Sequence, residues 1–225
     1  MKKIGMVVAM RKEILPFIEN SGVEVISEKV GKYEISSFKY LDKEIIIVES
    51  GVGEIYAAGA TQLLISKYEV ECIINFGVCG LVNDNLNLLE SVLVSGVVHY
   101  DFDLSKIDNL PVGQYPNMDR VISCENDLMN LVTSINPNIQ KVVCASADKF
   151  VVDHDIKNYL YNEFNASICE MESAGVVLTC LNNNIPFIVI KAVSDGKGGV
   201  EDYRKLVMSA SKSYIELIYK LLEVI

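Results

Sequence analysis

Apolar runs of strand length alternate along this chain with segments whose apolar residues recur at helical spacing. The strand-like runs span residues 3–10, 44–50, 72–78, 91–100, 141–147, 167–171 and 186–194. Helix-period segments occupy 13–22, 54–68 and 173–184, and a long helical pattern ends the chain. This rhythm predicts a largely parallel sheet wrapped by helices. Because the runs are continuously apolar rather than alternating, we expect helices to cover both faces of the sheet.

One segment departs from that rhythm. The sequence "YEISSFKYLDKEIIIVES" reads as a hairpin that turns at Leu41 and Asp42, so the sheet is expected to be mixed. The stretch from Asp101 to Ser123 is the one long irregular segment, and long loops in compact domains usually serve as lids or binding loops. With no repeat or interdomain linker, we predict an α/β fold with one domain over residues 1–225 and a mixed, mostly parallel central sheet flanked by helices.

Charge and hydropathy exclude two classes of partner. The chain has 30 acidic and 20 basic residues, for a net charge of −10, and the basic residues are scattered. A nucleic-acid partner is therefore not expected. No apolar run reaches membrane-spanning length, so no membrane partner is expected either. The opening "MKKIGMVVAM" reads as a first strand rather than a signal peptide, because "RKE" follows at once.

The cysteines and histidines point to a reduced, metal-free protein. The 6 cysteines show no CxxC spacing, and several stand inside apolar runs, as reduced core thiols do. A reducing cytoplasm is the expected compartment. With only His99 and His154 available, a metal site would lack its usual ligands, so neither a metal nor another cofactor is expected.

Polar residues that follow the strands are the candidates for a binding site, because ligands in open α/β sheets bind beyond the carboxyl ends of the strands. Several carboxylates occur there among aromatic and methionine neighbours, without an arginine cluster. Such a set suits a neutral or cationic substrate with hydroxyls and an aromatic ring, as in a nucleoside. The residues collected this way are Met10, Arg11, Lys12, Glu13, Val78, Cys79, Gly80, Asp101, Asp103, Asp148, Lys149, Phe150, Val151, Met171, Glu172 and Asp195.

The stretch "ICEMESAGVV", residues 168–177, is the most informative of these segments. It carries Glu170 and Glu172 among apolar residues, where a buried strand or helix would normally hold no carboxylate. At least one of the two side chains must point inward, since residues two apart share a face on a strand and diverge around a strand-to-helix turn.

Common nucleotide and hydrolase motifs are absent or incomplete. Gly51 and Gly53 follow a strand, but Tyr56 stands where the third glycine of a dinucleotide fingerprint would be. Tyr33 and Gly198 follow the two glycine-lysine pairs where a phosphate loop needs Ser or Thr. A GxSxG nucleophile elbow is also missing.

Four segments together resemble one family. "IGMVVAMRKEI" near the start, "IINFGVCG" at 73–80, "EMES" at 170–173 and "IPFIVIKAVSD" at 185–195 are similar to segments of the methylthioadenosine/S-adenosylhomocysteine nucleosidases, in the same order. These enzymes belong to the nucleoside phosphorylase superfamily. The resemblance covers almost the whole chain and implies a nucleoside phosphorylase-like fold and hydrolysis of an N-glycosidic bond in an adenine nucleoside.

The resemblance also implies catalytic roles. Asp195 matches the aspartate that protonates adenine N7, assisted by Ser194. Glu13 matches the glutamate that positions and deprotonates the attacking water. Glu172 matches the glutamate that accepts hydrogen bonds from the ribose hydroxyls, which leaves Glu170 as the weaker candidate of that pair. An acid, a base and an anionic partner for an oxocarbenium-like sugar are what cleavage of a glycosidic bond needs.

Further residues match the walls of the family's pocket. Met171 matches the residue against the sugar, Phe150 and Val151 match the segment that stacks on adenine and bonds it through the backbone, and Met10 is expected to line the pocket. The family's homodimer, in which a partner loop closes the 5′ site, implies that Tyr115 or Pro116 lies near the neighbouring subunit's pocket.

The chain departs from the family at the expected water site. Val78 stands in place of a usual serine, and Lys191 in place of an arginine, so water positioning is expected to rest on Glu13 and Lys191. Arg11 and Lys12 replace acidic residues before the catalytic glutamate.

Two alternatives stay open at this point. In a nucleoside phosphorylase, phosphate replaces water. Phe76 stands where the superfamily's phosphorylases carry an arginine, which favours hydrolysis, although Arg11 and Lys191 keep phosphorolysis possible. The other alternative is a nucleoside-binding protein without catalytic activity.

Overall fold

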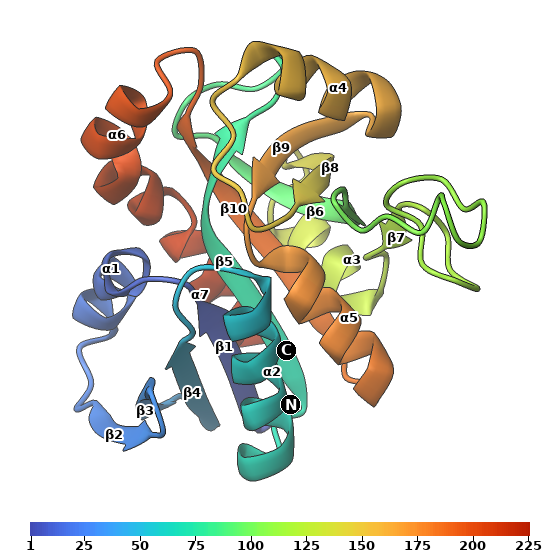
Figure 1. Cartoon of the computed structure of the whole chain (residues 1–225). Coiled ribbons are helices and arrows are strands. Elements are labelled where there is room, and N and C mark those ends of the chain that lie inside the picture. Colours follow the sequence, from blue (N-terminus) through green and yellow to red (C-terminus); the bar gives the residue numbers. More distant parts are fainter.

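The computed structural model describes residues 1–225 as an α/β domain around one mixed sheet (Figure 1). The strand order is β10-β6-β8-β9-β5-β1-β4-β3-β2, and the short β7 pairs with β6. The strands are β1 (Lys3–Val8), β2 (Ile26–Val30), β3 (Tyr33–Tyr40), β4 (Lys43–Glu49), β5 (Cys72–Leu81), β6 (Ser91–His99), β7 (Ile122–Ser123), β8 (Gln140–Ser146), β9 (Ala166–Glu170) and β10 (Phe187–Asp195). The predicted fold class is confirmed.

Two long central strands organise the sheet. β5 and β10 run parallel to each other, and every residue of both is buried. β10 also pairs with β6, while the far end of β5 pairs with β9, so that β10, β6, β8, β9 and β5 close on themselves. The carboxyl ends of β1, β5, β9 and β10 consequently converge on one region.

The predicted hairpin is present. β3 and β4 are antiparallel with Tyr40 opposite Lys43, so the chain turns at Leu41 and Asp42 as expected. Leu41 has φ of 54°, the left-handed conformation that tight turns of this kind require. β2 extends this antiparallel edge through its pairing with β3.

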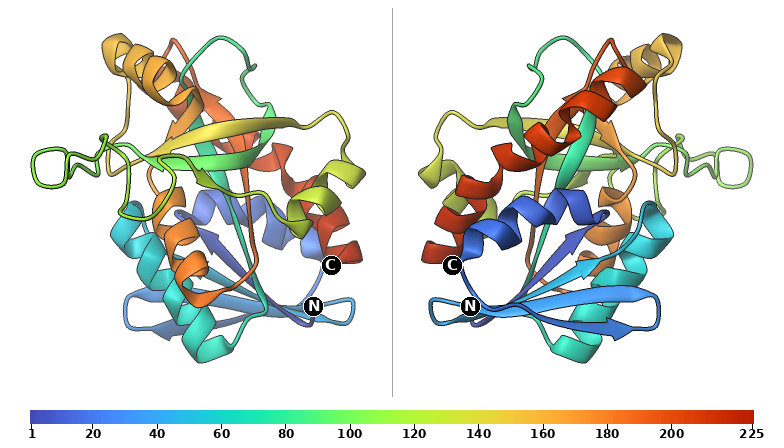
Figure 2. Two further views of the ribbon diagram at one scale, coloured as in Figure 1. Left: turned by 90° about the vertical axis from the view of Figure 1, so that its right-hand side faces the viewer. Right: turned by 90° about the vertical axis from the view of Figure 1, so that its left-hand side faces the viewer.

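Helices cover both sides of the sheet (Figure 2). α2 packs with α5 on one side, whereas α1 packs with α6 and α3 packs with α7. The helices are α1 (Arg11–Ser21), α2 (Glu54–Tyr68), α3 (Asp127–Ile135), α4 (His154–Phe164), α5 (Ser173–Asn183), α6 (Val200–Ser213) and α7 (Ile215–Val224). Sequence periodicity missed α3 and α4, whose N-termini are capped by the side chains of Asn126 and Asp153.

The segment between β6 and β7 is the long irregular loop that the sequence predicts. It protrudes from the body of the domain, as the green segment at the right of Figure 1 shows. The six cysteines are free and buried, in agreement with the sequence analysis. None of the helices combines the length and apolar character that crossing a membrane requires.

Candidate active site

A cavity of about 260 Å³ opens where the carboxyl ends of the central strands converge. β5 contributes three consecutive residues, β9 and β10 contribute their last residues, and the segment after β1 supplies the opposite wall. The lining residues are Met10, Glu13, Val52, Val78, Cys79, Gly80, Phe150, Cys169, Glu170, Met171, Glu172, Ser194, Asp195 and Tyr203. Eight of the predicted site residues are therefore brought together, namely Met10, Glu13, Val78, Phe150, Met171, Glu172, Ser194 and Asp195.

Glu13 is fixed in the first turn of α1. Its two carboxylate oxygens accept hydrogen bonds from the backbone N–H groups of Met10 and Val78, each at 2.9 Å. A Cβ atom at Gly77 would lie 2.8 Å from Glu13 Oε1, so only glycine leaves room for this carboxylate. Burial raises the pKa of Glu13 above its ordinary value, although these hydrogen bonds and Lys191 oppose the shift.

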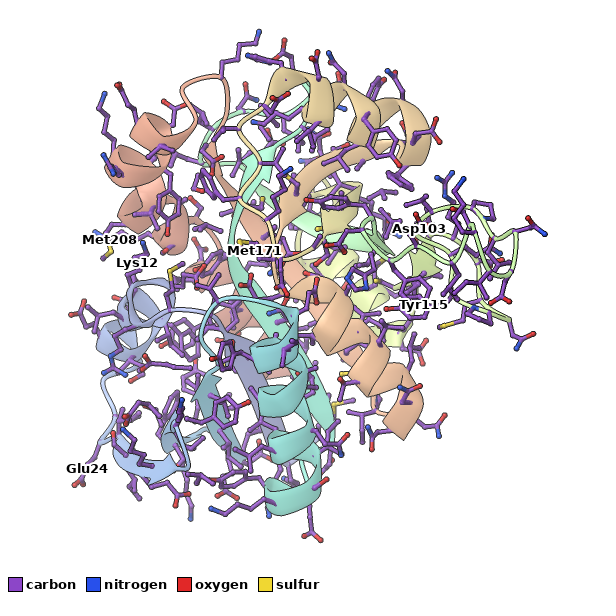
Figure 3. All side chains as sticks on the ribbon, in the orientation of Figure 1. Lys12, Glu24, Asp103, Tyr115, Met171 and Met208 are labelled. Carbon is purple, nitrogen blue, oxygen red and sulfur yellow. The ribbon has the colours of Figure 1, made fainter.

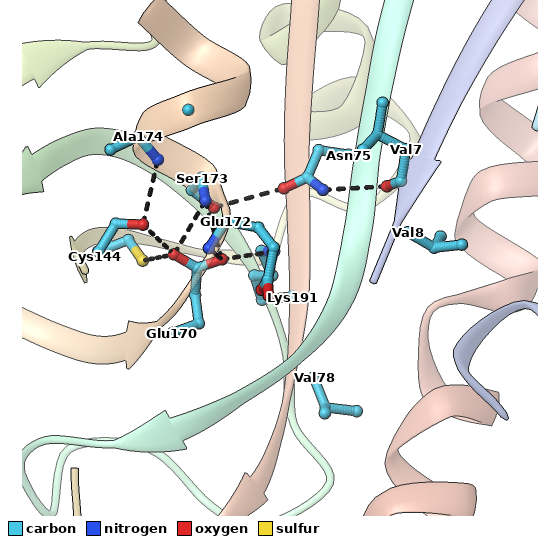
Figure 4. Close-up of polar contacts among 12 residues, drawn as sticks. Val7, Val8, Asn75, Val78, Cys144, Glu170, Glu172, Ser173, Ala174 and Lys191 are labelled. Carbon is cyan, nitrogen blue, oxygen red and sulfur yellow. Dashed lines mark hydrogen bonds and ion pairs between the residues drawn. The ribbon is translucent and has the colours of Figure 1, made fainter. Parts of the chain in front are cut away.

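Glu170 and Glu172 are both buried, so the cavity receives both carboxylates of the "EMES" segment. Glu170 Oε2 lies 2.8 Å from Lys191 Nζ, and the carboxylate also accepts bonds from the backbone N–H groups of Glu172 and Ser173 (Figure 4). Burial alone would raise the pKa of Glu170, but the Lys191 ammonium and these hydrogen bonds hold it below its ordinary value. Glu170 thus closes the N-terminus of α5 and fixes the backbone from which Glu172 projects.

Glu172 keeps one oxygen on the backbone, where Oε1 accepts a hydrogen bond from Gly53 N at 3.0 Å. Burial and the neighbouring Glu170 carboxylate raise the pKa of Glu172 to about 8. A cationic group placed against Glu172 would therefore gain more from this carboxyl than a neutral one, because it would help the carboxyl to ionise.

Sequence reasoning missed Glu54, the first residue of α2. Its carboxyl group contacts Ser146 Oγ and the backbone N–H of Gly175, and Ser146 Oγ also lies 2.6 Å from Glu170 Oε1. Ser146 has one hydroxyl proton for two carboxyl groups, so one contact requires a proton on a carboxyl. Burial and Glu170 raise the pKa of Glu54 to about 7 while the pKa of Glu170 is lowered, so the shared proton favours Glu54 over Glu170. No motif marks Glu54, because its partners lie far away in the sequence.

Asp195 ends β10 with one oxygen bound and the other free. Ser194 Oγ donates a hydrogen bond to Asp195 Oδ1 at 2.8 Å, while the buried Oδ2 has no partner. A Cβ atom at Gly80 would lie 2.9 Å from Oδ2, so glycine keeps this oxygen accessible from the cavity. Burial raises the pKa of Asp195, which favours its protonated form. A buried oxygen without a hydrogen-bond partner in a cavity wall is available to hydrogen-bond a ligand.

The remaining wall is largely apolar. Phe150 meets the ring of Tyr203 edge to face at 5.5 Å between centroids, and Tyr203 Oη contacts Met10 Sδ. Figure 3 shows Met171 near the centre of the molecule. Lys12 belongs to the first turn of α1, and its ammonium lies over the Tyr203 ring. The walls thus offer flat apolar surfaces next to the carboxyl groups.

Four of the sequence-predicted residues lie elsewhere. Lys191 does not line the cavity, because its ammonium binds Glu170 behind it. Val151 lines a small adjoining cavity of about 30 Å³, together with Phe150. Tyr115 lies on the protruding loop, stacked on Phe102 with 3.8 Å between ring centroids (Figure 3), and Pro116 follows it there, exposed.

Phe76 and Arg11, the two further positions that bear on phosphate binding, both lie outside the cavity. Phe76 is buried in the core and packs on Phe17 and Tyr214. Arg11 points away to pair with Glu49, at 2.8 Å between Nη1 and Oε1. No group of three or more His, Cys, Asp and Glu side chains has the arrangement of a metal site.

Comparisons with known proteins show which family this chain belongs to. The model of the phosphorylase superfamily matches residues 3–223. An aminodeoxyfutalosine nucleosidase from Helicobacter pylori is 32% identical over 199 residues, which are 87% of this chain and 86% of the relative. A 5′-methylthioadenosine/S-adenosylhomocysteine nucleosidase from Staphylococcus haemolyticus is 27% identical over 231 residues, covering 99% of this chain and 100% of the relative.

A solved structure shares the whole fold. The 5′-methylthioadenosine/S-adenosylhomocysteine nucleosidase from Helicobacter pylori, solved with butyl-thio-DADMe-Immucillin-A, superimposes with a TM-score of 0.95 at 27% identity. The match covers 100% of this chain and 99% of that one.

Proposed function

Since this chain belongs to the phosphorylase superfamily, we propose that its cavity binds an adenine nucleoside and hydrolyses the N-glycosidic bond. The observation that carries the proposal is that Glu13, Glu172 and Asp195 line one cavity with apolar walls. Hydrolysis of this bond needs an acid for the departing base, a base for water and an anion beside the sugar. Three buried carboxyl groups in different environments suit three different roles.

Asp195 is the proposed acid. Its pKa is raised by burial, so the carboxyl retains a proton when an unperturbed aspartate would have lost it. The free Oδ2 is the atom that would donate this proton to adenine N7, while Ser194 orients the carboxyl through Oδ1. Phe150 would stack on the adenine ring, and the backbone of Val151 would bond its edge.

Glu13 is the proposed base. The backbone N–H groups of Met10 and Val78 hold its carboxylate in one orientation, which positions a base well for abstracting a proton from water. The Val78 side chain offers no hydroxyl to that water, and Lys191 is engaged by Glu170. In this proposal Glu13 therefore holds the water, and Lys191 acts through Glu170 as a positioning residue.

Glu172 is the proposed ribose anchor, with Met171 against the sugar. Because burial and Glu170 raise the pKa of Glu172 to about 8, its carboxyl can still carry a proton near neutral pH. It can therefore both donate hydrogen bonds to the ribose hydroxyls and accept hydrogen bonds from them. As the glycosidic bond breaks, positive charge develops on the sugar and favours ionisation of Glu172. The interaction would therefore strengthen in the transition state, which is the condition for catalysis.

The proposed substrates are 5′-methylthioadenosine and S-adenosylhomocysteine, which would give adenine and the thioribose product. Relatives named for these substrates and relatives named for aminodeoxyfutalosine both include matches over 99% of this chain, so aminodeoxyfutalosine is the competing substrate. Incubating the protein with each nucleoside and identifying the products chromatographically tests the proposal. Free adenine from at least one nucleoside supports it, and an intact set of nucleosides contradicts it.

Hydrolysis rather than phosphorolysis is proposed because Arg11 and Lys191, the two cations that the sequence left open for phosphate, are both engaged. Phosphate recognition needs fixed donors, usually arginines. Arg11 pairs with Glu49, Lys191 pairs with Glu170, and Phe76 is a core residue. Running the same incubation with and without phosphate separates the reactions, since only phosphorolysis yields a sugar phosphate.

A homodimer in the cytoplasm is also proposed. Tyr115 bonds to His99 of β6 at the base of the protruding loop, and the exposed Pro116 that follows it is the residue offered to a second subunit. Six free thiols suit a reducing compartment. Analytical ultracentrifugation at micromolar concentration tests the assembly, and a species with the monomer mass alone would contradict it.

A further inference from the structure

A second cavity of about 220 Å³ lies beside the proposed acid and has no part in the mechanism above. It shares no lining residue with the first cavity. Gly80 and Asp195 line the first cavity, and the residue that follows each of them, Leu81 and Gly196, lines the second. Its other walls come from the segment after β5 and from α4. The full lining is Leu81, Val82, Asn83, Asp84, His154, Lys157, Asn158, Tyr161, Gly196 and Lys197.

Lys157 is the unusual member of this cavity. The residue is 5% exposed, yet no carboxylate lies within ion-pair distance of its ammonium. Its only hydrogen bond runs from Nζ to the carbonyl oxygen of Gly196, at 3.2 Å, which leaves two of the three ammonium protons without a protein acceptor. A buried cation without a direct ion-pair partner is costly, and an anion bound against its free protons would offset that cost.

A second donor in the same cavity lacks a partner. Asn83 Nδ2 is buried without a hydrogen bond, while the other side of this amide, Oδ1, accepts from Asn85 N at 3.1 Å. The amide orientation is therefore set by Asn85 and leaves the two N–H groups of Asn83 free. Two unsatisfied donor groups, one of them charged, meet in one cavity.

The other charges at this cavity do not neutralise Lys157. Lys197 and Asp84 pair with each other at 2.7 Å between Nζ and Oδ2, and both side chains are mostly exposed at the rim. His154 is exposed at the start of α4, and Asn158 and Tyr161 carry no charge at neutral pH. The interior of the cavity is thus positive.

We propose that this cavity binds a small oxyanion of the phosphate type, with Lys157 and Asn83 as its principal donors. Phosphate offers several strong acceptor oxygens, which match an ammonium with free protons and an amide that lines the same cavity. The binding itself does not depend on the function proposed above.

Because the second cavity adjoins Asp195, an anion bound there would affect the proposed acid. This effect rests on the proposed function. Gly196 follows Asp195 directly, and the positive charge of Lys157 lowers the pKa of Asp195, whereas the charge of Asp202 on α6 raises it. An anion bound to Lys157 would cancel the lowering of the Asp195 pKa by the Lys157 charge, so Asp195 would keep its proton to higher pH. Phosphate would then extend activity on the alkaline side without being consumed.

Calorimetric titration of inorganic phosphate into the whole protein, at constant ionic strength with chloride, tests the site. Wild type is expected to bind, and Lys157→Met to bind about tenfold or more weakly, the loss expected for a charge-assisted hydrogen bond. Asn83→Asp is the second variant, because it keeps the shape of the side chain and opposes an anion without removing the buried lysine. Lys205→Met, an exposed change on α6, is the matched control and should bind as wild type does.

The proposed site would be overturned if wild type did not bind phosphate. It would also be overturned if Lys157→Met and Asn83→Asp both bound phosphate as tightly as wild type. The coupling is read separately from the pH profile of nucleoside cleavage, where phosphate should move the alkaline limb upward in wild type and not in Asn83→Asp. A protein that binds phosphate but cleaves no nucleoside would contradict the proposed function and leave the site standing. Formation of a sugar phosphate would instead identify phosphate as a substrate.

Discussion

Lys191 Nζ lies 2.8 Å from Glu170 Oε2, and the two side chains are only 2% and 3% exposed. Glu170 lines the candidate active site and Lys191 lies behind it, and the Glu170 carboxylate also accepts hydrogen bonds from the backbone N–H groups of Glu172 and Ser173 (Figure 4). A cation on β10 is thereby joined, through a carboxylate on β9, to the first turn of α5. The proposed ribose anchor Glu172 sits on that turn, so its position depends on the pair.

Lys191→Met is expected to lower the free energy of unfolding by about 3–5 kcal/mol, since it leaves the Glu170 carboxylate buried without its counter-charge. Urea unfolding at neutral pH measures this change. Lys220→Met breaks an exposed ion pair with Glu216 on α7 and should leave the free energy of unfolding nearly unchanged, because water and salt screen such a pair. Adding Glu170→Gln to Lys191→Met should restore part of the loss. A Lys191→Met protein as stable as Lys220→Met would contradict the assigned pairing.

Glu54→Gln is expected to stabilise the protein at alkaline pH and to have less effect in acid. The ordinary pKa of 4.5 rises to about 7 in the folded state, so the folded protein binds more protons than the unfolded chain between these values. Stability contributed by Glu54 is therefore lost as pH rises through this window, at up to roughly 1.4 kcal/mol per pH unit. Glutamine keeps an acceptor for Gly175 N and cannot ionise.

Unfolding free energies of Glu54→Gln and wild type, measured at several pH values, give the test. The difference should grow from about pH 4.5 to about pH 7 and then level off. Glu223→Gln, an exposed change at the end of α7, serves as the control and should show no such trend. A difference that is constant across the window would place the shared proton on another group.

The fold followed from sequence more completely than the site did. Continuous apolar runs predicted the buried strands because each run carries its own signal, and the hairpin turn at Leu41 and Asp42 is equally local. α4 begins at the side-chain cap that Asp153 provides, and a search for helical periodicity does not detect such a cap. At the site, strand ends gathered Glu13 and Asp195 correctly into one cavity.

Contacts between distant segments were the part that sequence could not supply. Lys191 was expected at the water site, but the closure of β10 against β5 and β9 directs its ammonium to Glu170. Glu54 approaches Ser146 and Gly175 only because α2 packs on α5. Each of these pairings depends on how the sheet closes, which residue types and spacing do not encode locally.

Ser194→Ala is expected to move the alkaline limb of the pH–activity profile upward while lowering the maximal rate. The Ser194 hydroxyl donates to Asp195 Oδ1 and lowers the pKa of this carboxyl, partly offsetting the rise caused by burial. Without the hydroxyl the acid keeps its proton to higher pH, but it is less well oriented, and a loss of about tenfold in kcat is reasonable for a hydrogen bond to a charged group. The profile of kcat/KM reports the limb in the free enzyme. Ser209→Ala on α6 is the control, and an unmoved limb in Ser194→Ala would separate Asp195 from the alkaline titration.

Glu13→Gln is expected to abolish most turnover while leaving nucleoside binding nearly intact. Glutamine keeps an acceptor oxygen for the backbone N–H of Met10 or Val78 but cannot take a proton from water, so kcat should fall by about 10²–10⁴-fold. Product formation from methylthioadenosine and calorimetric binding of a non-hydrolysable nucleoside analogue measure the two properties independently. Glu19→Gln, an exposed change on the same helix, should behave as wild type. Loss of turnover in Glu13→Gln alone supports the enzyme, whereas binding without turnover in both Glu13→Gln and wild type would identify a nucleoside-binding protein that exploits the same three carboxyl groups for recognition.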